Sequence, residues 1–322
     1  FGGFSFTADV FTESRNNILM TRAYIPSTMG LGAPIRANVG KARAYGVDAS
    51  LDYNRSFGND WWLQGRLNFT YARGEYLYYE EPEYADNLKH LSRNGRALNQ
   101  VWGYIAERLF IDEHDVANSP RQNFGEYGPG DIKYYDVNGD NQITELDKVP
   151  LGHPTVPEIV FGQGLSVGYK LIDFSFFFQG SARSSFWIDP VRTAPFVRNP
   201  DLGNGSQNAL LKAYADDHWS EDNRNSYALW PRLSSTLNEN NTQVSSWFMR
   251  NGAFLRLKSV ELGYRLPTRW TDRIRLTNAR IYANGTNLLS FSGFKLWDIE
   301  MGGRGLGYPI QRVFNLGIQI NF

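Results

Sequence analysis

The sequence is limited first by what it does not contain. Its 322 residues include no cysteine, which excludes a disulfide framework, thiol catalysis and cysteine-ligated metals. Lys plus Arg and Asp plus Glu both number 33, so the formal net charge is zero and nothing electrostatic favours nucleic acid. No window approaches ~18 uninterrupted apolar residues, which excludes membrane-spanning helices. A barrel strand needs only ~10 alternating residues, so residence in a membrane stays open.

The N-terminal residues also lack a targeting signal. The segment FGGFSFTADVF has no basic start, no apolar central region and no initiator methionine, so it is not a signal peptide. Its alternation begins at once, as if the chain started inside a strand. We expect the sequence to be a piece of a longer protein or a processed product.

The clearest pattern present lies in residues 158–183, which read EIVFGQGLSVGYK, LI and DFSFFFQGSAR. Apolar residues alternate with small or polar ones on both sides of a short join at Lys170 and Leu171. This period of two predicts two antiparallel strands joined as a hairpin. One face is aliphatic and aromatic, and the other carries glycine, serine and glutamine. Such a pair of faces suits a barrel wall with lipid outside and a wet or plugged lumen inside.

Alternation elsewhere predicts six more long strands, near residues 4–10, 46–54, 61–78, 247–266, 279–286 and 314–322. In the fourth of these the apolar parity changes, which predicts a bulge near Lys258. The connections alternate between long and short. Long irregular segments are expected at 14–44, 80–157 and 184–245, with a short extra strand near 104–110 in the second.

This arrangement is typical of transmembrane β-barrels, which have short periplasmic turns and long extracellular loops. We therefore predict an all-β fold, namely an antiparallel transmembrane β-barrel portion of about eight strands. Residues 80–157 and 184–245 are the predicted extracellular loops, and the C-terminal Phe322 lies on the periplasmic side. A water-soluble β-protein is the alternative, although it would not usually sort its connections this way.

Six stretches carry a family resemblance. They are GDIKYYDVNGDNQI at 130–143, FSFFFQG at 174–180, WPRL at 230–233, SSWFMRNGAFLRLKSVELGYRLP at 245–267, ARIYANGTNLLSFSGF at 279–294, and the ending FNLGIQINF. Together they resemble the C-terminal part of SusC/RagA-type TonB-dependent outer-membrane transporters. Each stretch alone is a weak signal, whereas the joint match from about Gly130 to the end is specific.

The resemblance implies that residues 1–322 are the C-terminal part of a barrel of ~22 strands around an N-terminal plug. It implies the outer membrane of a Gram-negative, Bacteroidetes-like cell, with outer-membrane lipid around the barrel. It also implies TonB-driven import of glycans or peptides, with a SusD-like surface lipoprotein as lid. TonB would act through a plug region absent from this chain. Open sheet edges are not tolerated in lipid, so the remaining barrel strands are expected elsewhere.

The sharpest local motif is DVNGDNQITELD, residues 136–147. Its oxygen ligands fall at positions 1, 3, 5, 7 and 12 of an EF-hand-like loop, which suits a calcium ion. They belong to Asp136, Asn138, Asp140, Gln142 (through its backbone carbonyl) and Asp147. Asn141 replaces the usual glycine at position 6, and asparagine tolerates the left-handed conformation. We predict a structural calcium site, with a metal-free surface turn as the alternative.

No catalytic site is predicted. The histidines have no zinc-ligand spacing, and all four lie in predicted loops: His90, His114, His153 and His218. No GxSxG elbow occurs. The glycine run at 302–307 lacks the Lys-Ser/Thr and the helix of a phosphate loop. The acidic residues Glu80, Glu81 and Glu83 form a patch beside two tyrosines, interpreted as a solvated loop face, with sugar contact as the alternative.

Two further sets of residues follow from the barrel prediction. Aromatic residues near strand ends fit interfacial girdles, with ordinary loop packing as the alternative: Trp61, Trp62, Tyr169, Trp270 and Phe322. Polar residues are expected to face the lumen and to contact a plug or a hydrated solute: Asp48, Asp52, Arg66, Asn68, Arg280 and Asn284.

Three functions are compatible with these residues. The first is an outer-membrane nutrient importer, and the second is a barrel that serves as a scaffold subunit of a larger outer-membrane complex. An upstream plug with a TonB box, or energy-dependent uptake, would separate these two. The third is an outer-membrane enzyme or adhesin, for which the strand residues offer no convergent Ser/His/Asp or paired-carboxylate site.

Overall fold

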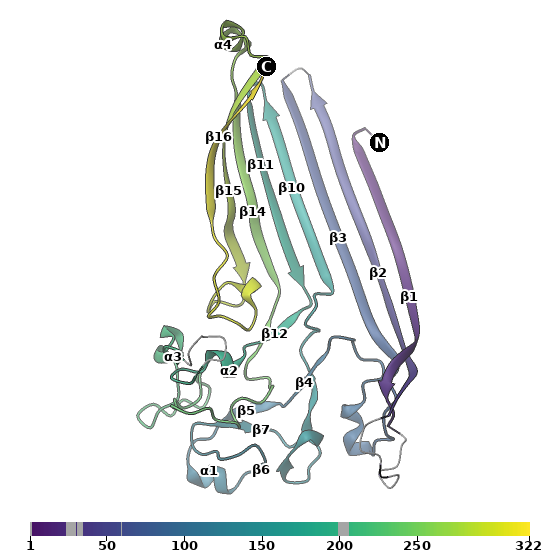
Figure 1. The fold of residues 1–322 in the computed structure, drawn as a ribbon, viewed down its shortest axis with the longest axis vertical. Helices are drawn as coiled ribbons and strands as arrows, with labels where there is room; N and C mark the ends of the chain where they lie inside the picture. The colour runs from purple at the N-terminus through teal and green to yellow at the C-terminus, as the bar shows by residue number, and fades with distance from the viewer. Residues whose placement is uncertain (1, 24–29, 31–34, 59, 199–205) are drawn as a thin grey trace.

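The structure, a computed structural model, describes residues 2–23, 30, 35–58, 60–198 and 206–322. Parts of three predicted segments lie outside the described residues. These parts are 24–29 and 31–34 in the predicted irregular segment 14–44, residue 59 in the turn before the third strand, and 199–205 in the predicted loop 184–245. The described residues form one tall sheet and a group of loops at one end of it (Figure 1).

Eight strands make up the sheet, and each long strand pairs antiparallel with the next long strand of the chain. They are β1 (Phe4–Thr21), β2 (Arg36–Phe57), β3 (Trp61–Tyr78), β10 (Ile159–Tyr169), β11 (Ile172–Ala182), β14 (Phe254–Arg265), β15 (Asn278–Ser292) and β16 (Val313–Asn321). The period-two alternation of these segments gives every strand one apolar and one polar face. The predicted all-β fold with eight long antiparallel strands is confirmed.

The first two strands are longer than the alternation predicts. β1 continues to Thr21 and β2 begins at Arg36, so much of the predicted irregular segment 14–44 is strand. Residues 14–17 read SRNN and are all polar, so the sequence shows no alternation there. Backbone pairing alone, from Glu13 with Ala44 to Thr21 with Arg36, continues the hairpin beyond the patterned region.

The predicted bulge in β14 is confirmed. Phe177 pairs with Ser259 and Phe178 pairs with Leu257, so Lys258 is the extra residue between them. The register with β15 also shifts beside Lys258, but there the extra residue belongs to β15, since Leu257 pairs with Leu289 and Ser259 pairs with Thr286. The bulge returns the apolar residues on both sides of it to one face of the sheet.

The connections sort to the two ends of the sheet. Residues 170–171 form a tight turn at one end, where Phe57 at the end of β2 pairs with Trp61 at the start of β3 and where residues 266–277 add the short helices α4 (Thr268–Thr271) and η5 (Asp272–Ile274). The C-terminus lies at this end (Figure 1). Residues 79–158, 183–253 and 293–312 connect strands at the opposite end, and we call these three connections the cap.

The cap contains short elements and the only large cluster of fully buried side chains among the described residues. Its elements are η2 (Asp86–Leu91), β4 (Val101–Gly103), β5 (Ala106–Leu109), α1 (Glu113–Ala117), β6 (Arg121–Gln122), β7 (Ile132–Tyr134), β8 (Gln142–Ile143), η3 (Glu145–Asp147), β9 (Val149–Leu151), β12 (Ser185–Trp187), α2 (Pro190–Thr193), α3 (Lys212–Asp216), β13 (Met249–Asn251) and η6 (Ile299–Met301). The extra strand predicted near 104–110 is β5, which pairs with β7. No helix in the described ranges is long and apolar enough to cross a membrane.

Candidate functional site

The two faces of the sheet differ in chemistry. Cross-strand pairing carries one apolar row over six strands, through Leu63, Val167, Phe174, Leu262, Ala283 and Leu316. This face is uncovered: the exposed fraction is 38% for Phe174, 79% for Leu316 and 65% for Ile318. A water-soluble protein does not present apolar side chains in this way over a whole sheet, whereas a wall in contact with lipid does.

The opposite face is polar, and it holds all six residues predicted to face the lumen. One of its rows runs through Asn54, Gln64, Ser166, Ser175, Glu261, Asn284 and Asn315. The predicted residues lie on this face because their positions in the register share the parity of that row: Asp48, Asp52, Arg66, Asn68, Arg280 and Asn284. The structure therefore brings them to one surface, as predicted.

An ion cluster lies on the polar face near the short-turn end. Arg280 donates from Nε to Oδ1 of Asp173 at 2.8 Å and from Nη2 to Oε1 of Glu261 at 2.7 Å. Asn284 donates to the same Glu261 carboxylate at 3.4 Å. A Cβ at Gly263 would lie 2.1 Å from Oδ2 of Asp173, so a glycine is needed for the cluster to lie flat against the wall. One arginine thus bridges two carboxylates, which leaves a net charge of −1.

Aromatic rings also lie flat on this face, each over a glycine of a neighbouring strand. A Cβ at Gly168 would meet Nε1 of Trp62 at 2.0 Å, and a Cβ at Gly317 would meet Cζ of Tyr282 at 2.5 Å. This contact corrects the prediction that Trp62 belongs to an interfacial girdle. Consecutive strand residues point to opposite faces, so Trp61 and Trp62 cannot both face lipid.

The remaining girdle candidates lie at or beyond the strand ends. Trp61 and Tyr169 are cross-strand partners on the apolar face, with ring centroids 4.3 Å apart. Trp270 is in α4 and is 49% exposed, and Phe322 is 93% exposed at the C-terminus. A role for these four residues at the membrane interface stays a prediction.

The predicted calcium loop 136–147 folds as a tight turn held by its own acidic side chains. Asp136 accepts hydrogen bonds from the backbone N–H groups of Gly139 and Asn141, both at 2.7 Å. Asn138 accepts from the N–H of Asp140 at 2.9 Å. Asn141 adopts the left-handed conformation, with φ of 63°, which its side chain tolerates at the position where glycine is usual.

The last residue of this loop, Asp147, is completely buried. Its carboxylate accepts from the backbone N–H of Val137 at 2.9 Å and from that of Thr144 at 2.8 Å, so it joins the two ends of the loop. Among the described residues, no group of three or more His, Cys, Asp or Glu side chains is arranged to hold a metal ion. The predicted site relies also on the Asn138 amide and the Gln142 carbonyl, and calcium binding there stays a prediction.

The other residues considered from the sequence have structural partners. Glu80 accepts from Nε of Arg22 at 2.8 Å, and Glu81 accepts from the N–H of Arg93 at 2.9 Å. These carboxylates therefore hold loops together and are not a free acidic patch. Nε2 of His90 lies 2.7 Å from the carbonyl oxygen of Leu146. In the glycine run, Gly305 lies under the ring of Trp297, which would be 2.2 Å from a Cβ there.

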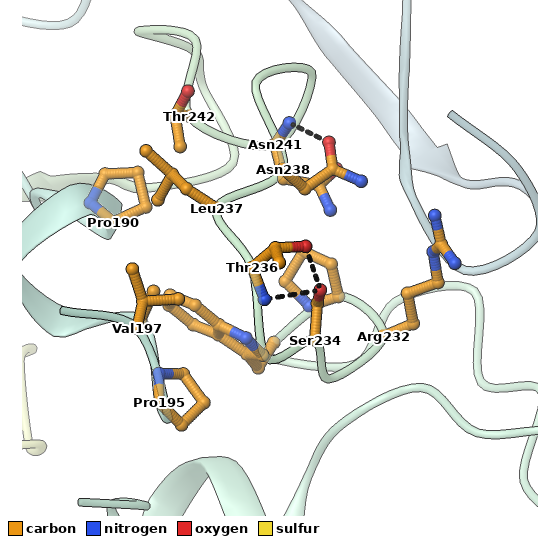
Figure 2. A pocket seen from close by; sticks show the side chains of 13 residues that line it. Pro190, Pro195, Val197, Arg232, Ser234, Thr236, Leu237, Asn238, Asn241 and Thr242 are labelled. Atoms are coloured by element: carbon orange, nitrogen blue, oxygen red, sulfur yellow. Dashed lines mark hydrogen bonds between the residues drawn. The ribbon is translucent and has the colours of Figure 1, made fainter. Parts of the chain in front are cut away.

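A small pocket lies in the cap beside α2. Figure 2 shows Pro190, Pro195, Val197 and Leu237 around it, with Arg232 to one side. Its cavity volume is about 30 Å³, which leaves room for about two water molecules. The pocket is too small to be a substrate site.

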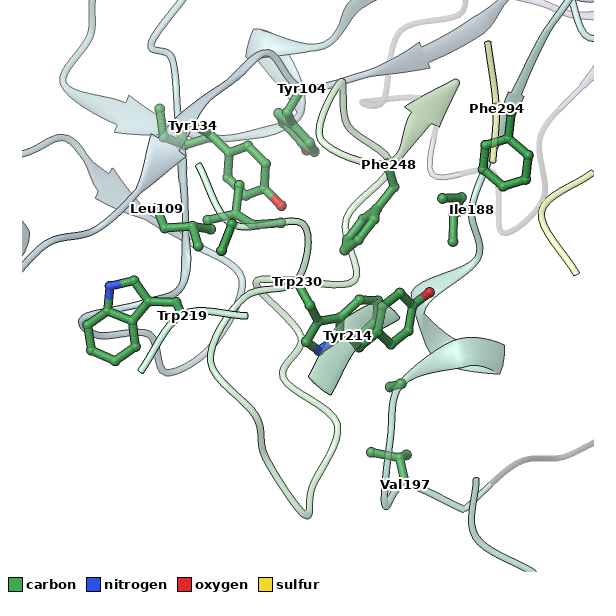
Figure 3. Close-up of a cluster of buried hydrophobic side chains, with 14 of the residues drawn as sticks. Tyr104, Leu109, Tyr134, Ile188, Val197, Tyr214, Trp219, Trp230, Phe248 and Phe294 are labelled. Carbon is green, nitrogen blue, oxygen red and sulfur yellow. The ribbon is translucent and has the colours of Figure 1, made fainter. Parts of the chain in front are cut away.

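The pocket adjoins the buried core of the cap, shown in Figure 3. Tyr214 stacks on Trp230 with ring centroids 4.2 Å apart, and the ring centroids of Trp230 and Phe248 are 5.2 Å apart. Burial raises the pKa of Tyr214 to about 12. Tyr104 from the connection 79–158 and Phe294 from the connection 293–312 belong to the same core, so residues far apart in the sequence are buried together.

A polar network ties the same connections together. Asp131 is fully buried and accepts two hydrogen bonds from Arg232, from Nε and Nη2, both at 2.8 Å. Asn241 donates to Asp131 at 2.8 Å as well. The hydrogen bonds to Asp131 raise the pKa of the Arg232 guanidinium. No local pattern in the sequence relates residues about a hundred positions apart, so this network could not be predicted from it.

The two-faced sheet, with its turns at one end and its cap at the other, defines part of the wall of a transmembrane β-barrel. No protein-family model matches the chain. It is 33% identical over 206 residues to TonB-dependent receptor P26 of Formosa agariphila, covering 60% of this chain and 20% of the receptor. It is 24% identical over 315 residues to TonB-dependent receptor SusC of Bacteroides thetaiotaomicron, covering 94% of this chain and 29% of that receptor.

Among solved structures, the chain is similar to the RagAB peptide transporter, with a TM-score of 0.68 at 22% sequence identity. That match covers 99% of this chain and 33% of the solved chain, and it supports the fold. The predicted resemblance to SusC/RagA-type TonB-dependent receptors is confirmed. The chain spans between a fifth and a third of the length of these relatives. All three are described as receptors or transporters and none as an enzyme.

Proposed function

We propose that the chain forms part of the barrel wall of a TonB-dependent nutrient importer in the bacterial outer membrane. The observation that carries the proposal is the sheet with one uncovered apolar face and one continuous polar face. In this arrangement the apolar face contacts lipid and the polar face surrounds the lumen. The tight turns and the C-terminus lie in the periplasm, and the cap lies outside the cell, with residues 80–157 and 184–245 as extracellular loops.

Import needs parts that would lie outside this chain. The remaining barrel strands would close the wall, and an N-terminal plug would fill the lumen and connect to TonB. A SusD-like surface lipoprotein would close over the cap and capture a glycan or a peptide. The cap is suited to carry such a lid because its buried core and the network around Asp131 give it a defined shape. A scaffold role is the second candidate, since it would use the same wall without transport.

A calcium ion in loop 136–147 would be a structural part of the cap. The side chains of Asp136, Asn138, Asp140 and Asp147 and the backbone carbonyl of Gln142 would supply its oxygen ligands. The loop is already turned in the required sense by Asn141 and by the hydrogen bonds of Asp136. The ion would stiffen the loop and would take no part in transport chemistry.

The proposed lumen role is tested by replacing Arg280 with Leu in the full-length receptor. The change leaves Asp173 and Glu261 unpaired beside each other on the polar face, so energy-dependent uptake and retention of the plug should both fall. Arg269→Leu, in the turn at α4, is the matched control and should leave both unchanged. Uptake should also disappear when TonB is deleted.

Two results would count against the proposal. If Arg280→Leu matches the wild type in uptake and in plug retention, the polar face around Arg280 does not serve the lumen. If the wild-type receptor assembles in the outer membrane but shows no TonB-dependent uptake of any glycan or peptide, the scaffold role replaces the import role.

A further inference from the structure

Charged side chains gather on the outward side of the sheet, where β2 and β3 reach the cap (Figure 1). Cross-strand pairing places Arg73 beside Tyr45 and Glu75 beside Arg43. These four residues share their strand parity with Tyr71 and the rest of the apolar face, so they point away from the lumen. They are therefore separate from the ion cluster around Arg280, which lies on the polar face.

The charged side chains begin where the apolar band of the wall ends. On the outward side of β3, no charged residue occurs between Trp61 and Tyr71, and Arg73 is the next position on that side. At ~3.3 Å per residue and a tilt of ~40°, this uncharged run is about 25 Å tall, which is the height of the apolar band of a transmembrane barrel. Arg73 therefore lies just beyond the band, at the level of lipid headgroups.

The charges are arranged in two layers. Glu75 and Glu158 lie beneath, with side chains that are 14% and 3% exposed, whereas Arg43 and Arg183 are 46% and 42% exposed. Arg43 donates from Nη2 to Oε1 of Glu75 at 2.6 Å, and Arg183 donates from Nε to Oε2 of Glu158 at 2.5 Å. Arg73 lies between the two carboxylates, at 3.7 Å from Glu75 and 3.5 Å from Glu158.

We call these five residues the arginine group. Its three guanidinium groups and two carboxylates leave a net charge of +1. Because the carboxylates are the buried members, they hold the arginines in place, and the surface that the group presents is made of guanidinium N–H donors. Such a surface is complementary to an anion.

Arg183 reaches the outward side because it lies beyond the end of its strand. It follows the last residue of β11 and adopts the left-handed conformation, with φ of 54°, so the alternation of β11 ends before it. The hydrogen bond to Glu158 raises the pKa of the Arg183 guanidinium, and Tyr71 and Tyr45 act in the same direction. The guanidinium therefore lies near two rings of the outward face.

An apolar hollow lies on the same side of the sheet, closer to the tight turns. Its volume is about 390 Å³, and its apolar lining includes Leu51, Tyr53, Leu67, Leu165 and Phe176. It exists because Gly65 has no side chain: a Cβ there would meet nothing nearer than Leu165 at 3.7 Å. From Arg73 to Leu67 the strand spans about 20 Å, or about 15 Å in height, which is the depth of one leaflet of a ~30 Å hydrocarbon core.

We propose that the arginine group binds the phosphate of a lipid in the outer leaflet, an inference that rests on the proposed placement of the cap outside the cell. The planar guanidinium fork matches the oxygens of a phosphate, which makes arginine the suitable cation here. An acyl chain of the same lipid extends along the apolar face and fills the hollow at Gly65. The hollow favours a lipid over free phosphate, and the position beside the apolar band favours a lipid over a protein that covers the cap.

The experiment uses the full-length receptor in detergent, titrated with monophosphoryl lipid A, with bound lipid counted by native mass spectrometry. Dephosphorylated lipid A and inorganic phosphate are the comparison probes. The variants are Arg43→Gln and Arg183→Gln. The matched control is Arg224→Gln, because Arg224 is a cap arginine that also donates from Nη2 to a glutamate at 2.6 Å and is 50% exposed. Heat-dependent migration in gel electrophoresis confirms that each variant is folded.

We expect the wild type to bind monophosphoryl lipid A and to bind the dephosphorylated lipid at least fivefold more weakly. Arg43→Gln and Arg183→Gln should each weaken binding of the phosphorylated lipid about fivefold, which is typical of one arginine near an anionic surface. Arg43→Gln leaves Glu75 beside Arg73, so this variant should fold even if the loss of Arg183 disturbs the buried Glu158. Arg224→Gln should bind like the wild type.

Three results would overturn the lipid site. The first is equal binding of the phosphorylated and dephosphorylated lipids, and the second is unchanged binding in the folded variants Arg43→Gln and Arg183→Gln. The third is displacement of the lipid by millimolar inorganic phosphate, which would assign the group to a free anion.

Measurement of TonB-dependent uptake separates this inference from the import function. If the wild type takes up substrate but any of these three results is found, the lipid site fails and import stands. If uptake is absent while binding of lipid A still depends on Arg43 and Arg183, import fails and the lipid site stands.

Discussion

The sheet and the cap place their apolar residues differently: the cap buries them in a core, whereas the sheet exposes them on one face. In the cap, Tyr104 and Leu109 are 0% exposed and form a core in the ordinary way. In the sheet, Val10 is 83% exposed and Phe314 is 75% exposed, and the polar residues face inward to the lumen. The same chain therefore has one region with an apolar interior and one region with an apolar surface. The difference shows that the sheet is fitted to lipid and the cap to water.

The largest difference in stability between the two regions is expected when a large apolar side chain is truncated in each of them. Phe248→Ala leaves a cavity in the cap core, where Phe248 is 1% exposed, and should destabilise the cap by about 3–5 kcal/mol. Hydrogen exchange in the cap strands β5 and β12 should accelerate, while exchange in β10 and β11 should not change. Phe314→Ala is the matched control, because lipid fills the space that its side chain leaves. Equal effects of the two variants on the cap would contradict the assigned burial.

A charge introduced on the apolar face should destabilise the sheet and leave the cap unchanged. Leu316→Arg places a charge on the lipid-facing side and should destabilise the barrel by about 2–4 kcal/mol, as charges do near the middle of a bilayer. Asn315→Arg is one residue away on the polar face and should have little effect. Urea unfolding of the full-length protein in phosphatidylcholine vesicles measures both variants. If the two arginines are tolerated equally, the faces have been assigned wrongly.

Ionisation of the Tyr214 phenol should make the cap more sensitive to alkali than the sheet. Burial raises the pKa of its phenol to about 12, above the value of about 10 for an unfolded chain. The stability gained from the neutral phenol is fully present below pH ~10 and is lost as pH rises through about 12. The fluorescence of Trp230, which stacks on Tyr214, should fall over that range.

Two tyrosine variants check this assignment. Tyr214→Phe keeps the ring and removes the ionisation, so the fluorescence change near pH 12 should become smaller. Tyr227→Phe removes the hydroxyl of a tyrosine that is 70% exposed and should leave the change as it is. A change that survives in Tyr214→Phe would have to come from another group.

The smallest expected effect concerns calcium in the cap. A calcium concentration of one hundred times Kd should stabilise the loop 136–147 by about 2.7 kcal/mol, and EGTA should reverse this. Asp140→Asn keeps an oxygen ligand but removes one of its negative charges, so it should reduce the gain. Asp86→Asn, which removes a surface carboxylate that pairs with Lys89, should keep it. Calorimetric titration with calcium alone decides the matter, since no heat of binding in the wild type would exclude the site.

The sequence predicts the sheet better than it predicts the cap, for a physical reason. Strand alternation is local, and so β3, the hairpin of β10 and β11, and the bulge at Lys258 could all be located from neighbouring residues. Where both faces are wet, as at the far end of β1, the signal disappears although the backbone pairing continues. The adjacent residues Trp61 and Trp62 lie on opposite faces, so the prediction that both belong to a girdle holds for Trp62 in neither chemistry nor position.

Contacts within the cap depend on residues far apart in the chain. Asp131 meets Arg232 about a hundred positions later, and Tyr104 lies in the same buried core as Trp230, which belongs to another connection. No period in the sequence encodes such pairs. Phe177 lies between these cases: the break that it makes in the alternation of β11 is visible in the sequence, whereas the two glycines against which its ring lies follow from the register.

The bulge at Lys258 has a consequence for how such a gene can change. Inserting or deleting a single codon inside a strand would turn every following side chain of that strand around, exposing serines to lipid and leucines to the lumen. Codons can therefore be gained or lost within strands in pairs, or singly where a bulge absorbs the odd residue. Loops have no alternating faces, so single codons can be gained or lost in them without turning the side chains of any strand to the wrong face.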